Sequence, residues 1–198
     1  MKLLPESILQ HAQSLAEGGV LSPKEFLHLA SRAAVDQALS RLTKEGKLLR
    51  VVRGTYVTPV SSRFGTRAPA PEKVVQALAA QTGEVVAPHG ANAANALGLT
   101  QQLPIRQVYL TSGRTRKLKF GRAEVMLKHA PRWMLALGSG LAGAAVCALA
   151  WIGPTHVGEA LATLHSTLPP SDWQTLTSAR ATLPSWMARA IGEEAIRG

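Results

Sequence analysis

The middle of the chain concentrates basic side chains that could bind a polyanion. Residues 105–132 hold eight basic side chains and one acidic side chain, so this stretch supplies most of the net charge of +10. A cluster of one sign favours nucleic acid as a partner, because phosphates carry the opposite charge. The alternative is a solvated face that only aids solubility. The eight residues are Arg106, Arg114, Arg116, Lys117, Lys119, Arg122, Lys128 and Arg132.

A second set of polar side chains follows Ser31, where apolar spacing predicts a helix with one buried face. Val35, Ala38, Leu39 and Leu42 form that face, and Ser31 can cap the helix. Arginine and glutamine suit base edges in a major groove, whereas serine and lysine suit phosphates. The face left exposed consists of Arg32, Asp36, Gln37, Ser40, Arg41 and Lys44.

The elements around this helix predict a DNA-binding plan for residues 1–60. Apolar spacing indicates a first helix over 5–16, and Ser22-Pro23-Lys24-Glu25 is typical of a capped start to a second. β-branched residues flanking Arg53-Gly54 predict a hairpin over 48–57, which offers Arg50 and Arg53 to the DNA backbone or minor groove. Three helices and a hairpin form a winged helix-turn-helix, although such domains also mediate protein contacts.

The pattern changes after a stretch rich in Pro, Ser and Gly. We interpret residues 61–71 as a linker, in which Arg63 and Arg67 could contact phosphates. Residues 72–198 then predict an α+β domain, because three strands within 107–128 are followed by helices over 141–152, 157–164, 173–181 and 185–197. Arg114, Arg116, Lys117 and Lys119 are expected near one hairpin of this domain, where they would extend the contact with DNA.

The segment 134–152 has no charged residue over a length that could cross a membrane. It is rich in Ala and Gly, which gain little in lipid, so we expect a buried core helix. Cys147, the sole cysteine, lies inside it and is expected to be an inert thiol. The N-terminal residues include Glu6 and His11, which do not fit a signal peptide, and we expect a cytosolic protein with no membrane association.

His89, Asn92 and Asn95 form the one segment that suggests catalysis. His89 could act as a base, and the two asparagines, three residues apart, share a helical face. The alternative is that small residues allow close helix packing while the asparagines satisfy buried backbone groups. No nucleophile accompanies the histidine, and no metal-ligating or cofactor-binding motif occurs. We therefore expect no enzyme, cofactor or metal, with a nucleic-acid-processing enzyme using His89 as the less favoured class.

A series of motifs runs along the chain in one order. It begins with AAVDQALSRL and KEGKLLRVVRGTYVTP, and continues through PHGANAANALGLTQQLP and QVYLTSGRTRKLKFG. It extends through VMLKHAP and ALAWIG and ends near LPSWMARAI, so it covers nearly the whole chain. In these motifs the sequence resembles the AbiEi-like antitoxin family of type IV toxin–antitoxin systems.

This resemblance implies an antitoxin that also represses its own transcription. The winged helix of that family binds inverted repeats in a promoter, and the C-terminal domain counteracts a nucleotidyltransferase-like toxin without a stable complex. A stand-alone transcriptional regulator is the alternative. The expected partners are accordingly double-stranded DNA and such a toxin.

Overall fold

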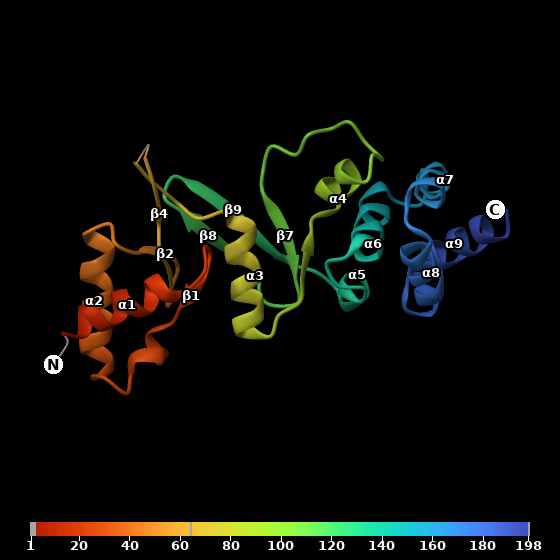
Figure 1. Cartoon of the computed structure of the whole chain (residues 1–198). Helices are drawn as coiled ribbons and strands as arrows, with labels where there is room; N and C mark the ends of the chain where they lie inside the picture. The colour runs from red at the N-terminus through yellow and green to blue at the C-terminus, as the bar shows by residue number, and fades with distance from the viewer. Residues whose placement is uncertain (1–2, 64, 198) are drawn as a thin grey trace. The chain divides into compact units, whose positions relative to one another are not determined.

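The computed structural model describes residues 3–63 and 65–197, which form a mixed α and β protein (Figure 1). The chain divides into two compact units, each considered by itself. Unit 1 contains residues 1–84 together with 117–125, and unit 2 contains residues 85–116 and 126–198. The boundary expected near residue 60 therefore lies inside unit 1, and one segment of the basic stretch belongs to the unit built from the N-terminal residues.

Unit 1 begins with three helical segments and a small sheet. Local sequence accounts for the helices: Ser22 and Glu25 form the predicted capping box, with the Ser22 amide donating to Glu25 Oε1 at 2.6 Å. The segments are α1 (Leu4–Ser14), β1 (Val20–Leu21), the 3₁₀ helix η1 (Pro23–Phe26), α2 (Arg32–Lys44), β2 (Leu49–Val52) and β3 (Thr55–Val57). The sheet has the antiparallel order β1-β3-β2.

The core of this part joins one face of each helix to the sheet. Ile8 from α1, Leu21 from β1 and Leu39 from α2 are fully buried in one apolar cluster with Leu48. Burial of apolar surface stabilises the folded state by roughly 25 cal/mol per Å² removed from water. The helices expected over 5–16 and after Ser31 and the hairpin expected over 48–57 are confirmed, the second helix is the short 3₁₀ helix η1, and β1 was not predicted.

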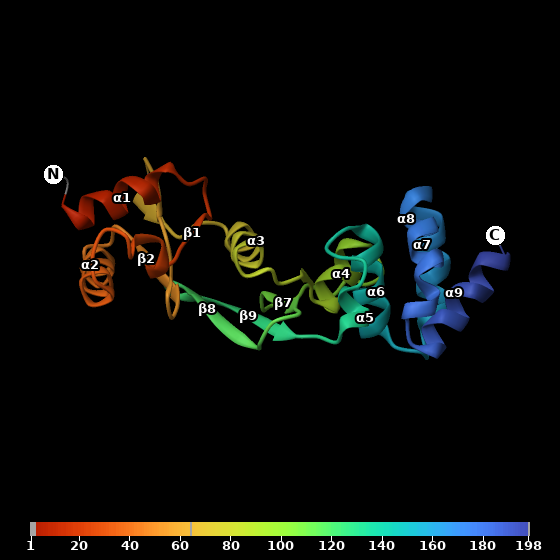
Figure 2. The same cartoon turned by 90° about the horizontal axis from the view of Figure 1, so that it is seen from below.

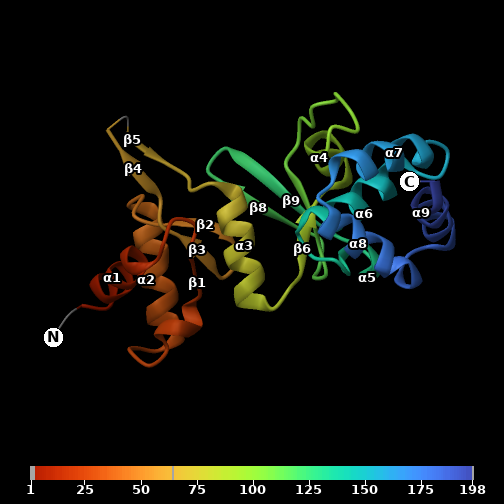
Figure 3. The same cartoon turned by 45° about the vertical axis from the view of Figure 1, so that its right-hand side comes forward.

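The remainder of unit 1 contains the segment that we interpreted as a linker. Two strands of this segment, β4 (Val60–Ser62) and β5 (Gly65–Arg67), pair in antiparallel fashion, and Figure 3 shows them before α3 (Pro71–Thr82). Gly18 has a φ of +86°, and a Cβ added to it would lie 2.5 Å from Lys73 Cβ, so only glycine allows the loop before β1 to approach α3 this closely.

Unit 2 combines a sheet with a group of helices. Its strands are β6 (Val86–Pro88), β7 (Val108–Thr111) and the last part of β9 (Ala123–His129), with β6 antiparallel and β9 parallel to β7. The strand β8 (Arg116–Phe120), of which all but Arg116 belongs to unit 1, pairs with β9, so the strand order is β6-β7-β9-β8. The helical elements are α4 (Gly90–Ala96), α5 (Arg132–Leu135), α6 (Leu141–Ile152), α7 (Val157–Thr167), α8 (Pro170–Ser178), η2 (Ala179–Thr182) and α9 (Ser185–Arg197).

Helix α6 lies at the centre of unit 2. Every residue from Ala142 to Leu149 is buried, because Ala145, Val146 and Leu149 pack with α7, α8 and α9, while Cys147 and Ala148 pack with α4 and β7. Figure 2 shows α7, α8 and α9 grouped beyond α6. The prediction of a buried core helix is thus confirmed. Within the described residues, no helix has the length and apolar character to span a bilayer.

Candidate nucleic-acid interface

Helix α2 is fixed by both of its ends and by one face. The Ser31 hydroxyl accepts a hydrogen bond from the Ala34 amide at 3.4 Å, as the sequence predicted, and Gly46 ends the helix in the left-handed region with a φ of +71°. The buried residues are Val35, Ala38, Leu39 and Leu42, the four that were predicted. A helix held in this way presents its opposite face rigidly to solvent.

The exposed face of α2 has a central stripe without acidic side chains. Successive residues are rotated by about 100°, so the residues directly opposite the buried face are Ala33, Gln37, Ser40 and Lys44. All four are exposed. This stripe offers an amide, a hydroxyl, an ammonium and a methyl group, which are the groups that read base edges and phosphates. Ala33 was not among the predicted residues.

The two predicted arginines of α2 lie on either side of this stripe, each in an ion pair. Arg32 Nε lies 2.9 Å from Asp36 Oδ2, and Arg41 Nε lies 3.0 Å from Glu45 Oε1. Their side chains are 55% and 74% exposed. Exposed pairs of this spacing contribute only about 0.2–1 kcal/mol, so either guanidinium can exchange its carboxylate for a phosphate or a base at small cost.

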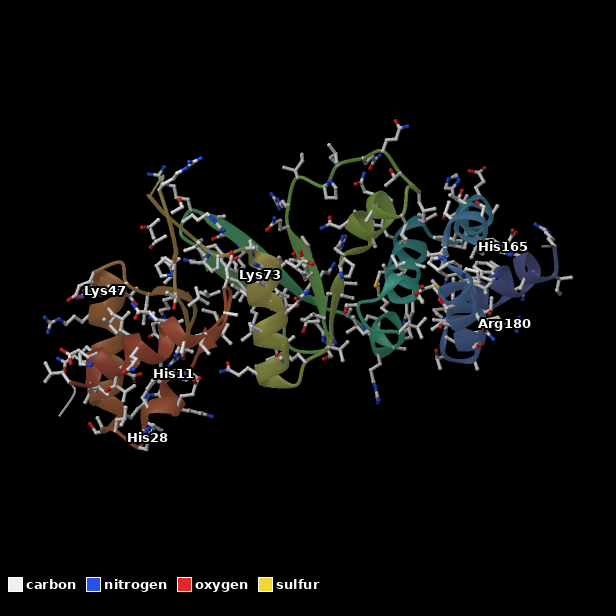
Figure 4. The ribbon with its side chains drawn as sticks, viewed as in Figure 1. His11, His28, Lys47, Lys73, His165 and Arg180 are labelled. Carbon is white, nitrogen blue, oxygen red and sulfur yellow. The ribbon has the colours of Figure 1, made fainter. Side chains whose placement is uncertain are left out.

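The C-terminal end of α2 adds a further cation that the sequence reading did not select. Lys47, labelled in Figure 4, lies 2.8 Å from Glu45 Oε2, so Glu45 binds two cations. These contacts, Lys47 first and then Arg41, lower the pKa of the Glu45 carboxyl. The carboxylate therefore remains ionised and reduces the positive charge beside Arg41.

The hairpin β2–β3 places the predicted Arg50 and Arg53 on its surface. Arg50 is exposed in β2, where strand alternation directs the neighbouring Val51 into the core, and Arg53 is exposed in the turn that follows β2. Gly54 forms the turn with a φ of +76°. Leu48 and Lys47 amides bond to the Leu42 carbonyl, which connects α2 directly to this hairpin. Two arginines thus lie on a hairpin that follows α2 by four residues.

Arg67 from the predicted linker takes part in a charged cluster within unit 1. Glu17 Oε1 accepts from Arg67 Nη2 at 3.2 Å, and Glu17 Oε2 lies 2.6 Å from Nζ of Lys73, which is labelled on α3 in Figure 4. Lys73, then the Ala70 amide, and finally Arg67 lower the pKa of Glu17 to about 2. Arg67 therefore serves first to connect β5 and α3 with the loop before β1. Arg63 is exposed on the β4–β5 hairpin.

The four basic residues expected near one hairpin lie on β8 or just before it, and β8 directs their side chains to both of its faces. Lys117 and Lys119 are exposed on one face of β8, whose other face buries Leu118 and Phe120. Arg116 is half-buried, and its Nη1 donates to the carbonyl of Arg114 at 3.0 Å. Side chains alternate along a strand, so Arg116 lies on the face opposite Lys117. Arg114 and Arg116 belong to unit 2, whereas Lys117 and Lys119 belong to unit 1.

Charge counts favour unit 1 as the more basic unit. It holds fourteen basic and eight acidic residues, a net of +6, whereas unit 2 has a net of +4. Lys117 lies 3.4 Å from Glu124, but in the described residues Lys119 and the exposed Arg122 form no ion pair. Arg122, in the turn after β8, was counted in the basic stretch but not selected as a binding residue. The β8–β9 hairpin thus adds cations to the unit that contains α2.

One family profile matches residues 7–168, more than half of the chain. The chain belongs to the DUF6088 family. That family is described as one of unknown function. No curated protein and no solved structure matches the sequence. The DUF6088 match includes α2, the three hairpins that carry arginines and all strands of unit 2, and it ends before α8.

In this DUF6088 chain, His89 and Asn95 form hydrogen bonds with nearby backbone groups. His89 Nδ1 accepts a hydrogen bond from the Ala91 amide at 3.4 Å and so caps α4. Burial, and then the nearby charge of Lys128, lowers the pKa of His89. Asn95 Nδ2 donates to the Thr100 carbonyl at 3.2 Å, as the structural alternative expected, whereas the buried Oδ1 of Asn92 has no partner. In the described residues no group of three metal-ligating side chains occurs.

Proposed function

We propose that unit 1 is a winged helix-turn-helix domain that binds double-stranded DNA, with α2 in the major groove. The order α1-β1-η1-α2-β2-β3 supports this assignment, because α2 is the second helix of a closely spaced pair and a hairpin follows it. The observation that carries the proposal is the exposed stripe of α2, which has no acidic side chain. A recognition helix needs such a face, because acidic groups on it would repel the phosphates of DNA.

In this proposal Gln37 and Arg41 read bases, and Ser40 and Lys44 contact phosphates. Glutamine pairs with adenine and arginine with guanine in the major groove, each contact contributing about 1–3 kcal/mol of discrimination. Arg32 lies near the start of the helix and releases Asp36 when it engages DNA. Arg50 and Arg53 bind the backbone or the adjacent minor groove. Lys119 and Arg122 extend the phosphate contacts.

The test is selection of duplexes from a random library by the full chain, followed by affinity measurements on the enriched site. The Q37A/K44A variant should lose most of the enrichment, while the circular dichroism melting curve stays unchanged, because both residues are exposed. The matched control is Arg189→Ala, an exposed cation on α9 outside unit 1. Failure to enrich any sequence, or equal enrichment by Q37A/K44A, would refute the proposal.

The narrower form of this proposal is an antitoxin that represses its own promoter. Its support is the sequence resemblance to AbiEi-like antitoxins, which implies binding to inverted repeats in the promoter. The partner is then a nucleotidyltransferase-like toxin encoded beside this chain. Growth arrest by the neighbouring gene product, relieved by co-expression of the full chain, is the expected result. A neighbouring product that does not arrest growth would leave the function of a stand-alone regulator.

A further inference from the structure

Unit 2 contains a pocket that brings together most of the tryptophan of the chain. Its volume is about 530 Å³, within the range of small-molecule sites. Three of the four tryptophans line it: Trp133 follows β9, Trp151 ends α6 and Trp186 begins α9. Trp133 and Trp186 are half-buried, and Trp151 is 41% exposed. An exposed aromatic ring leaves apolar surface in contact with water, and a flat ligand that stacks on the ring would cover this surface.

The position of Trp151 is determined by close packing and not by chance. A Cβ added to Gly90 would lie 2.4 Å from Trp151 Cβ and 2.5 Å from the Cys147 carbonyl oxygen. Glycine at position 90 therefore allows α4 to approach α6 at the level of this tryptophan. The helices hold the Trp151 backbone rigidly, so the wall of the pocket is preformed.

The polar groups of the pocket are donors and cations. The described residues that line the pocket include Lys128, His129 and His89, and none of them is acidic. Lys128 is exposed and forms no ion pair in the described part of the chain. His89 Nδ1 accepts from the Ala91 amide, which leaves the Nε2–H of the neutral ring as a donor. Lys128 contributes to lowering the pKa of His89, which is consistent with a positive potential there.

We infer that this pocket binds a small planar aromatic anion of the nucleoside monophosphate type. The flat ring stacks on tryptophan, and the anionic group is held by Lys128 and by the Nε2–H of His89. His129 donates its Nδ1–H to the Gly113 carbonyl at 2.8 Å, so this donor is already used within the protein. This binding does not depend on recognition of DNA by unit 1.

Tryptophan fluorescence of the full chain tests the inference directly, because three of the four emitters line the pocket. Adenosine 5′-monophosphate, adenosine and inorganic phosphate are the probes. The nucleotide should quench saturably, adenosine should bind about tenfold or more weakly, and phosphate alone should not quench. The expected ratio follows from loss of a charge-assisted hydrogen bond.

Matched variants separate this pocket from other binding modes. Lys128→Ala should weaken nucleotide binding about tenfold and leave adenosine unchanged, and Arg132→Ala, an exposed cation that does not line the pocket, should change neither. Trp151→Ala should remove a stacking surface and weaken both ligands by roughly five- to a hundredfold. Trp173→Phe is its control, since Trp173 stacks on His165 away from the pocket.

The outcomes decide the inference without reference to DNA binding. Saturable quenching by the nucleotide that depends on Lys128 and Trp151 supports it. Absence of saturable quenching by the nucleotide, or equal affinities of wild type, Lys128→Ala and Trp151→Ala, overturns it. Lys128 is exposed, so its substitution leaves the fold intact and keeps the test interpretable even if Trp151→Ala unfolds.

Discussion

The phosphate contacts of the β8–β9 hairpin give a prediction whose size can be calculated. Lys119 and Arg122 are exposed, belong to unit 1 and form no ion pair in the described residues. Each phosphate contact steepens the dependence of log affinity on log salt by about 0.9. Replacing both residues with alanine should therefore reduce the slope by about 1.8. Between about 50 and 200 mM salt, the wild type should lose roughly tenfold more affinity than the variant.

Fluorescence anisotropy of a labelled duplex over that salt range measures both slopes. The matched control replaces Arg189 and Arg197 of α9 with alanine, which removes the same charge from unit 2. We expect this control to keep the wild-type slope, because only counterions at contacted phosphates are released. An unchanged slope in the hairpin variant would show that Lys119 and Arg122 do not touch DNA. An equal reduction in the control would mean that net charge, not local contact, determines the slope.

Three further predictions concern the two units separately. The pKa of Glu17 is about 2, below its ordinary 4.5, so Glu17 contributes stability above about pH 4.5 that is lost as pH falls toward 2. Thermal unfolding should show Glu17→Gln destabilised at pH 7, with the difference from wild type shrinking below pH 4; a constant difference would contradict the ion cluster. The pKa of His89 lies below 6.5, so its stabilising cap is present above that pH and is lost on acidification. His89→Ala should cost about 1 kcal/mol at pH 8, whereas His89→Asn should keep the cap and abolish the acid sensitivity, and equal melting of both variants would contradict the capping role. Burial raises the pKa of the Cys147 thiol to about 11, so iodoacetamide should modify it only on unfolding; rapid labelling of the native protein, measured by mass spectrometry, would contradict its burial.

The sequence predicted those features of the fold that depend on neighbouring residues. The Ser22–Glu25 capping box, the Ser31 cap and the buried face of α2 all follow from side chains within one or two helical turns. The buried character of α6 was likewise predictable from its composition. These local signals placed every predicted binding residue of α2 on the exposed surface.

The features that sequence reasoning missed depend on contacts between distant residues. β1 has two residues, and its pairing of Val20 with Val57 joins positions 37 residues apart, so no local pattern marks it. The β4–β5 hairpin was obscured by the Pro, Ser and Gly content that it shares with linkers. Assignment of residues 117–125 to unit 1 and the assembly of three tryptophans around one pocket arise only when the chain folds back.

Recognition of DNA by α2 is tested most directly by base discrimination at Gln37. On a selected site and on single-base variants of it, anisotropy should show that Gln37→Ala loses about 1–3 kcal/mol at one or two neighbouring base pairs. Its affinity for random duplex should match that of the wild type, because an amide contributes no phosphate attraction. Equal losses on every sequence, or an unaltered preference at each base pair, would contradict the placement of α2 in the major groove.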